Sequence, residues 1–337
     1  MIGFRERAHG GLNALMRADD AEFGTLARDL IADETVWHIA APVNRLEGRD
    51  AVVEQFLRPL RAALAACRRR DEIFIGGQNI RAERGRWVAS VTHYVGNFDA
   101  VLWGLAPSHH LAFLRAGEFY RLEGAPGAEE IVEARIIMDL PDLMRQCGAR
   151  PFDGHLGTEM LFPGPATHDG VLPTSGRGTA SIDLVEQMIA DLHAFDPETK
   201  SSHGQTGEDG AWDEHMLWYG PGGIGSNYLW EGFVKDHRAG FLHAFPDRKG
   251  GNHYCRFGDG DYAAISGWPS MTMTHQGAYL GVPATGKSLT LRVMDFYRCD
   301  FSRYARGKLA ENWVLLDYVD LFAQMGIDLI ARGNVRA

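Results

Sequence analysis

The sequence predicts an α+β protein that contains two copies of one fold, each a curved antiparallel sheet packed on helices. Three observations carry this prediction. The chain has 337 residues, which is enough for two domains. Sequence landmarks in the first part recur in the same order and at near-equal spacing in the second part. Within each part, apolar residues recur first at helical spacing and then in alternation, which is typical of helices followed by a meander of strands.

The repeat is clearest near the end of each copy. Residues 117–121 (GEFYR) recur as 294–298 (MDFYR), and residues 139–148 recur as 317–326 with an acid, a glutamine and a glycine in equivalent places. We further match Thr92-His93 with Thr274-His275, and Trp37 with Trp218. These landmarks predict a first domain over residues 1–148 and a second over 181–337, joined by a connector over 149–180 that is rich in Pro, Gly, Ser and Thr.

Periodicity predicts the elements in order. Helical spacing of apolar residues predicts helices near 52–60, with a kink at Pro59, and near 182–192. Alternation predicts strands near 72–80, 86–94, 111–122 and 130–138, and in the second copy near 262–266, 270–275, 288–298 and 308–316. The polar stretch 197–210 predicts a loop. Such a sheet curves into a cone, whose interior is the expected ligand pocket.

Composition excludes several classes of protein. Asp plus Glu number 44 and Lys plus Arg 34, and the net charge of −10 argues against a nucleic-acid partner. The four cysteines show no CxxC spacing and fit a reducing compartment. The apolar runs fall far short of the ~20 residues that cross a membrane, and the first residues lack a signal-peptide pattern. We therefore expect a cytoplasmic protein with no membrane partner.

Two formal nucleotide-binding patterns are better explained as turns. Residues 281–288 match GxxxxGK[ST], but the alternating residues that follow predict a strand rather than the helix that a phosphate loop needs. Residues 220–225 match GxGxxG, but no convincing βαβ unit surrounds them. We interpret that segment as a turn before a helix that Ser226 caps.

The chain resembles the SnoaL-like polyketide cyclases of the NTF2-like superfamily, which are cone-shaped α+β barrels. The resemblance is carried by Thr274-His275-Gln276-Gly277, by 295–298 (DFYR) and by the segment from Gly307 to Gly326. It covers about 225–326 well and 37–148 more weakly, and it therefore implies a tandem pair of NTF2-like domains. Single-domain relatives commonly pair through their sheets. The resemblance thus implies an internal pseudo-dimer of the two halves, with a homodimer of the whole chain as a further alternative.

One departure from the family leaves open whether the protein is an enzyme. In characterised cyclases of this family, an Asp in the last strand is the acid/base of an intramolecular aldol ring closure. The equivalent position is Val314 here, and Ile136 in the first half. The positions of a pocket glutamine and histidine of those enzymes carry Val293 and Asp295.

A single acid beside a tyrosine is the strongest chemical signal in each copy. Period-two alternation places Asp295 with Tyr297, and Glu118 with Tyr120, on otherwise apolar strand faces. Burial raises the pKa of such a carboxyl group, by up to ~3–5 units when it is complete. A carboxylate of raised pKa can take a proton from the carbon next to a carbonyl group. The alternative is an acid paired with a neighbouring arginine in a structural network.

Histidines and tryptophans supply further candidates. His93 and His275 each follow apolar strand positions and are expected to point inward, either to polarise a carbonyl group or as hydrogen-bonded core residues. Trp37, Trp218 and Trp313 are candidate walls for a flat ligand, or core. Asp139 and Asp317 are interpreted as helix N-caps. We expect no metal site and no cofactor.

These interpretations combine into one functional expectation. We expect a cofactor-independent lyase, isomerase or cyclase of the SnoaL-like type that acts on a small apolar, polyketide-like carbonyl compound, with Asp295 and His275 as catalytic residues. The expected ligand pocket comprises Trp218, Tyr297, Val293, Val314, Trp313, Glu118, His93, Tyr120 and Trp37. The alternative is a non-catalytic small-molecule-binding or scaffold protein of the NTF2-like superfamily.

Overall fold

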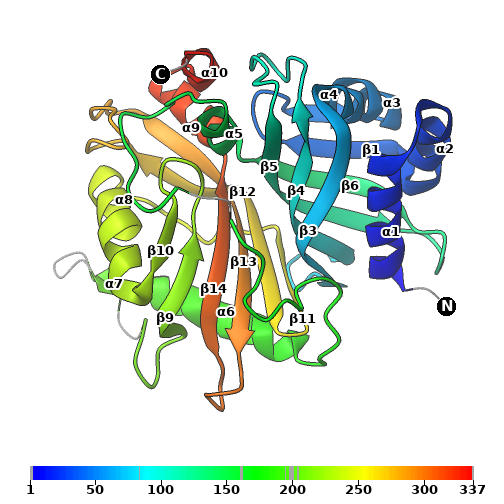
Figure 1. Cartoon of the computed structure of the whole chain (residues 1–337). Helices are drawn as coiled ribbons and strands as arrows, with labels where there is room; N and C mark the ends of the chain where they lie inside the picture. The colour runs from blue at the N-terminus through cyan, green and yellow to red at the C-terminus, as the bar shows by residue number, and fades with distance from the viewer. Residues whose placement is uncertain are drawn as a thin grey trace.

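The computed structural model describes residues 3–82, 84–159, 162–193, 195–196, 201–202 and 205–335, and these form two similar α+β halves that lie side by side (Figure 1). In the first half, the strands are β1 (Ile31–Ile39), β2 (Arg45–Glu47), β3 (Leu64–Gln78), β4 (Arg86–Phe98), β5 (Leu111–Glu123) and β6 (Glu130–Met138). Its helices are α1 (Phe4–Arg17), α2 (Asp20–Leu30), α3 (Arg49–Val52), η1 (Val53–Leu57), α4 (Arg58–Ala63) and α5 (Leu140–Gln146).

The second half repeats this order. Its main strands are β9 (Trp212–Tyr219), β10 (Ser226–Tyr228), β11 (Cys255–Asp259), β12 (Tyr262–Thr274), β13 (Ser288–Asp300) and β14 (Lys308–Leu316), and a small pair is formed by β7 (Phe195–Asp196) and β8 (Ser201–Ser202). Its helices are α6 (Gly178–His193), α7 (Leu229–Phe233), η2 (Val234–Arg238), α8 (Ala239–Ala244), α9 (Tyr318–Met325) and α10 (Leu329–Gly333). No helix in the described ranges is long and apolar enough to span a bilayer.

The two six-stranded sheets have the same topology. The strand orders are β2-β1-β6-β5-β4-β3 and β10-β9-β14-β13-β12-β11. All neighbours are antiparallel except β1 with β6 and β9 with β14, which are parallel. The predicted fold class, two α+β units that each pack a curved sheet on helices, is confirmed.

Most individual predictions hold, and the exceptions have physical reasons. The strands expected near 72–80, 86–94, 111–122, 130–138, 288–298 and 308–316 are confirmed, as are the cap roles of Asp139 and Asp317, and 281–288 leads into β13 as expected. The two strands expected near 262–266 and 270–275 are one strand, β12, whose pairing with β13 shifts in register between Gly267 and Met271, and the short strand β11 before it was missed. We missed β1 and β9, whose parallel pairing gives no hairpin signal in the sequence. Ser226 begins a strand rather than a helix. The predicted loop at 197–210 lies partly outside the described residues.

The π-helical segments η1 and η2 occupy equivalent places in the two halves. Pro59 lies in the first turn of α4, directly after η1, where its missing N–H group is tolerated. The second half has the same π-helical segment without a proline. The π-helical irregularity at this place is therefore a feature of the fold and does not depend on Pro59.

The connector between the halves contacts both of them. Leu172 N donates to Phe74 O at 2.8 Å in the first half, and Thr158 forms a bridge with Ser226 of the second. The Trp313 indole donates to Pro163 O at 2.9 Å. The connector is thus a packed segment, and α6 follows it at Gly178.

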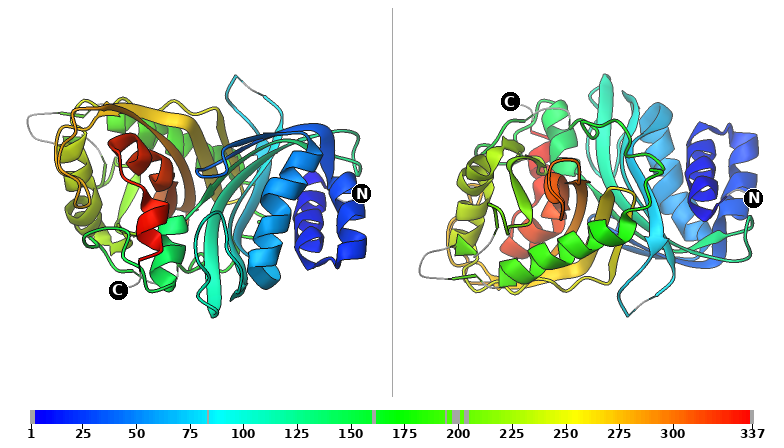
Figure 2. Two further views of the ribbon diagram at one scale, coloured as in Figure 1. Left: turned by 90° about the horizontal axis from the view of Figure 1, so that it is seen from above. Right: turned by 90° about the horizontal axis from the view of Figure 1, so that it is seen from below.

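The outer faces of the two sheets pack against each other, with α1 and α2 on the far side of the first sheet and α7 and α8 on the far side of the second (Figure 2). The contact is tight at Gly117, where an added Cβ would lie 2.8 Å from Leu315 Cδ1. The buried apolar residues of this interface are Ala40, Ile73, Ile75, Trp87, Ala89, Val91, Phe119 and Ile137 from one half, and Tyr219, Cys255, Phe257, Tyr262, Ala264, Met294, Phe296, Trp313 and Leu315 from the other. Each sheet is therefore buried on both faces.

Two aspartates tie the halves together in a reciprocal way. Asp139 caps α5 and accepts from Gly222 N of the other half at 3.1 and 3.2 Å. Asp317 caps α9 and accepts from Ala41 N of the first half at 3.2 Å. Because Ala41 and Gly222 follow the matched Trp37 and Trp218 by four residues each, the contacts are those of an isologous interface within one chain.

An arginine supports each of these aspartates. Fully buried Arg115 donates to Asp139 Oδ2 at 2.8 Å and to the Gly220 carbonyl oxygen at 2.7 Å. Arg292 donates to Asp317 Oδ2 at 2.8 Å, but its side chain is 23% exposed.

This difference predicts unequal stability losses. Arg115→Gln leaves Asp139 as a buried charge without its ion pair, and we expect a loss of about 3–5 kcal/mol. Arg292→Gln, the matched control, is expected to lose clearly less because water reaches that site. Urea denaturation followed by circular dichroism measures both values, and equal losses would contradict this view of the interface.

Candidate functional site

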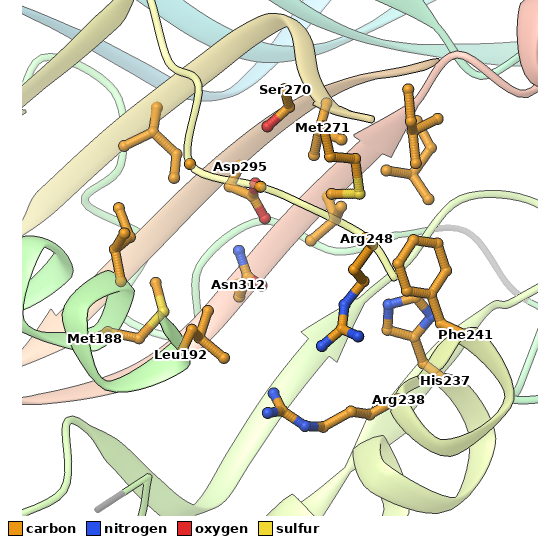
Figure 3. Close-up of a pocket in the computed structure, with 18 of the residues that line it drawn as sticks. Met188, Leu192, His237, Arg238, Phe241, Arg248, Ser270, Met271, Asp295 and Asn312 are labelled. Carbon is orange, nitrogen blue, oxygen red and sulfur yellow. The ribbon is translucent and has the colours of Figure 1, made fainter. Parts of the chain in front are cut away.

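A cavity of about 550 Å³ lies in the second half, between the inner face of the sheet and helices α6, α7, η2 and α8 (Figure 3). Its walls are largely apolar and aromatic. The sheet contributes Trp212, Trp218, Ile265, Met271, Leu291, Val293, Tyr297, Val314 and Leu316, and the helices contribute Met188, Ile189, Leu192, Trp230, Phe233, Phe241 and Leu242. The cavity therefore suits a small apolar molecule.

Asp295 is the one acid among the described residues that line this cavity. It lies on β13 between Val293 and Tyr297, which share its face. Burial raises the pKa of the Asp295 carboxyl to about 7, while the Asn312 amide and the Tyr297 hydroxyl lower it by favouring the charged form. Asp295 is half-buried and lines the cavity. Near neutral pH it thus exists in both protonation states.

Among the described residues, the Asp295 carboxylate lacks the ion pair that usually offsets the cost of burying an acid. Within the part of the chain that the structure describes, no arginine, lysine or histidine nitrogen comes within 4.0 Å of the Asp295 carboxylate, although 26 such ion pairs form elsewhere. Burial, followed by the nearby Asp295 charge, raises the pKa of the Tyr297 hydroxyl well above its ordinary value. Tyr297 therefore keeps its proton and acts as a hydrogen-bond donor to Asp295.

Hydrogen bonds that run from Arg256 through His253 orient a second polar group of the cavity, the Ser270 hydroxyl. His253 Nδ1 lies 3.1 Å from Arg256 Nε and 2.7 Å from Arg256 Nη2, and an arginine can only donate. Burial and the Arg256 charge lower the pKa of His253 to about 3. The ring is therefore neutral, with its proton on Nε2, which lies 3.2 Å from Ser270 Oγ.

The direction of the hydrogen bonds between Arg256, His253 and Ser270 decides which role the Ser270 hydroxyl can have. Because Nε2–H donates to Ser270 Oγ, His253 is not a base for this hydroxyl, and Ser270 is not an activated nucleophile. The hydroxyl proton is left for another acceptor. Ser270 lines the cavity on the same side as Asp295 (Figure 3), so it is placed to donate to an oxygen atom of a bound molecule.

In the first half, the equivalent acid is Glu118, and hydrogen-bond donors surround its carboxylate. Glu118 is fully buried and accepts from Arg69 at 2.7 and 3.1 Å and from Ser90 Oγ at 2.6 Å, and the Tyr94 hydroxyl also donates to it. Trp37 and Tyr120 are buried beside it, with their ring centres 5.6 Å apart. The arginine-paired alternative therefore describes Glu118.

Strand register explains why the two acids differ. Glu118 is paired with Ser90, whereas Asp295 is paired with Ile265, so a hydroxyl donor is replaced by an apolar side chain. Arg69 lies on β3, which has 15 residues, whereas β11 has five. The part of the edge strand that carries Arg69 has no counterpart in β11, and the cavity opens on this side of the second half.

Five of the predicted residues meet at the cavity. Asp295, Val293, Tyr297, Val314 and Trp218 all line it. Their strands are neighbours in the order β9-β14-β13, and alternation brings one face of each strand inward. This part of the predicted site is a single constellation.

Three other predicted residues lie elsewhere and require correction. Trp313 faces the opposite side of β14, where its ring lies 5.0 Å from that of Tyr219 in the interface. His93 lies on the outer face of β4, with its Nδ1 atom 3.5 Å from Glu72 Oε1. His275 follows β12, with Nδ1 3.1 Å from Thr285 Oγ1 and its ring 5.5 Å from that of Phe245. None of the three is among the residues that line the cavity.

Two features explain why the histidines were misplaced. The match of Thr92-His93 with Thr274-His275 is wrong in register, because Thr92 pairs with Ala116 whereas Thr274 pairs with Ser288. Moreover, the apolar face that precedes His93 is the face buried between the halves. Alternation alone does not distinguish it from an inner face.

Sequence reasoning missed the basic side of the cavity. Arg238, Arg248 and Lys249 line it from η2 and from the chain that follows α8. Neither they nor Ser270 belong to a recognisable motif. The described residues contain no cluster of three or more His, Cys, Asp or Glu side chains suited to a metal ion.

Equivalent substitutions in the two halves should have opposite effects on stability. Glu118→Gln breaks a buried ion pair, and we expect a loss of about 3–5 kcal/mol. Asp295→Asn removes a carboxyl group whose folded-state pKa lies above its unfolded value. The fold therefore favours protonated Asp295 at low pH and loses that contribution as pH rises from about 4 through 7.

Thermal melts between pH 4 and 9 measure this prediction. The Asp295→Asn variant should match the parent protein near pH 4 and melt higher above pH 7, by at least roughly 2–4 °C. A melting temperature lowered by Asp295→Asn above pH 7 would show that the carboxylate is stabilised by partners.

A comparison with known protein families matches the same half of the chain. Residues 231–325 match the model of the SnoaL-like polyketide cyclase family. No curated protein matches significantly.

Among solved structures, AclR, a putative hydroxylase from Streptomyces galilaeus, is 22% identical, covers 44% of this chain and 96% of its own, and has a TM-score of 0.33. IdmH, a putative polyketide cyclase from Streptomyces antibioticus, is 22% identical, covers 42% and 98%, and has a TM-score of 0.31. A putative polyketide cyclase from Acidithiobacillus ferrooxidans is 20% identical, covers 44% and 94%, and has a TM-score of 0.32. The matched range contains β12 to β14 and α9, so this part of the second half is similar to the SnoaL-like polyketide cyclase family.

Proposed function

We propose that the second half is a cofactor-independent acid/base enzyme of the cyclase, isomerase or lyase type, which acts on a small apolar carbonyl compound. The observation that carries this proposal is Asp295, an acid without an ion pair that faces an apolar cavity. A base with a pKa near 7 combines a sizeable ionised fraction with strength to take a proton from carbon.

The position of Asp295 accounts for the departure from the family pattern. The position of the family's catalytic Asp corresponds to Val314, and Asp295 is the direct cross-strand partner of Val314. Side chains in such pairs lie about 4.5–5.5 Å apart at Cβ and point to the same face of the sheet. A carboxyl group one strand away thus faces the same interior.

The proposed reaction needs only the groups described above. Ionised Asp295 removes a proton from the carbon next to the carbonyl group of the substrate, which leaves an enolate and a neutral carboxylic acid. The Ser270 hydroxyl donates to the carbonyl oxygen and stabilises the charge that develops there. The enolate is then reprotonated by Asp295 at another carbon of a conjugated system. Alternatively, it attacks a second carbonyl carbon of the same molecule, whose oxygen receives the electron pair of the C=O π bond and then the proton from Asp295.

Hydrogen exchange at carbon tests this step without knowledge of the natural substrate. The probe is 2-tetralone, a small apolar ketone, in deuterated buffer, and the loss of its α-proton signals is followed by NMR. The parent protein should accelerate the exchange, and Asp295→Asn should remove roughly 10²–10⁴-fold of that acceleration. Glu118→Gln, if it folds, is the matched control and should leave the rate unchanged.

Exchange should also depend on pH in one direction. Because only the ionised form of Asp295 accepts a proton, the rate constant should fall tenfold per unit below about pH 7 and level off above it. Equal exchange by the parent protein and the Asp295→Asn variant would remove Asp295 from the mechanism. Tight binding of the probe without exchange would instead favour the non-catalytic binding function.

A further inference from the structure

The charge distribution around the cavity points to the substrate class, an inference that rests on the proposed function of the same site. The chain as a whole carries a net charge of −10. The cavity has the opposite charge balance, because three cationic residues, Arg238, Arg248 and Lys249, and a single acid are among the described residues that line it. The cavity is therefore electropositive in a negatively charged protein.

The two arginines lie together. Figure 3 shows the guanidinium groups of Arg238 and Arg248 on one side of the cavity, and Asp295 with Ser270 on the other. Burial and the charge of Arg248 lower the pKa of Arg238 to about 10, and burial lowers the pKa of Arg248. Two cations held near each other and partly withdrawn from water gain from an anion between or beside them.

The remaining walls determine what carries the anion. Phe233, Phe241 and Trp230 lie on the helical side, and Leu192 and Met188 line the wall formed by α6. Neutral His237 stacks on Trp218 with ring centres 4.5 Å apart, and burial lowers its pKa to about 3, so it adds no charge. A bare inorganic anion leaves these surfaces uncovered.

We propose that the site takes an apolar compound that also carries a carboxylate, with the carboxylate on Arg238 and Arg248 and the reacting carbonyl group toward Asp295 and Ser270. The two charged ends of the cavity then fix the direction in which the substrate enters. They also keep the substrate's anion away from the catalytic carboxylate, which would otherwise repel it.

A matched pair of probes tests this proposal on the full chain. The probes are 2-naphthoate and 2-naphthamide, which share an apolar body and differ in charge, and acetate supplies the carboxylate alone. Isothermal titration calorimetry at pH 8 gives each affinity. We expect 2-naphthoate to bind about tenfold or more tightly than 2-naphthamide, and acetate to bind far more weakly than either.

Substitution of the two arginines tests whether they cause the preference for naphthoate over naphthamide. The double change Arg238→Gln and Arg248→Gln should remove most of the preference for naphthoate and leave the affinity for naphthamide within about twofold. Arg68→Gln, at an exposed arginine of the first half, is the control and should change neither affinity. If the double variant does not fold, added NaCl serves instead, because it should weaken naphthoate binding and spare naphthamide.

Three outcomes would overturn the proposal. These are equal affinities of the parent protein for naphthoate and naphthamide, a preference that survives both substitutions, and acetate binding as tightly as naphthoate. The proposed function fails separately. The Asp295→Asn variant should bind naphthoate at least as tightly as the parent protein, because it lacks a negative charge, whatever its effect on proton exchange.

Discussion

The cost of burying a carboxyl group is the constraint on which the difference between the two halves depends. Each half places one acid at the same position of its inner sheet face, on β5 in the first half and on β13 in the second. The first half offsets this cost with Arg69 and hydroxyl donors. The second half leaves the acid facing a cavity with a raised pKa. One half thus uses the acid to hold its core together, while the other keeps it available for chemistry, at the expense of stability.

The interface between the halves supports the strands that carry Asp295. The convex faces of both sheets are buried against each other, and Asp139 and Asp317 each bind the backbone of the opposite half. The strands that carry Asp295 and its neighbours are therefore supported from behind by a second folded unit. A rigid support keeps a reacting group in place, which general acid/base chemistry requires.

The sequence was sufficient to predict the two α+β units, most strands, both helix caps and the cavity residues on β13 and β14. Those predictions rest on local periodicity and on a repeat that the fold preserves. It was not sufficient to place His93 or Trp313, because a sheet buried on both faces is apolar on both faces, and alternation then no longer identifies the inner one. Nor could it show that β11 is short, which separates Asp295 from Glu118, since strand length at a sheet edge depends on tertiary packing.

The central claim is that Asp295 is a desolvated acid that faces the cavity without an ion pair. Its most direct test is the titration of the Asp295 side-chain carboxyl carbon by NMR, with the signal assigned by its absence from the spectrum of the Asp295→Asn variant. The account predicts a single transition near pH 7, far above the ordinary value for an aspartate. A transition at or below about pH 4 would show that the carboxylate is solvated or paired with a cation, and would contradict the account.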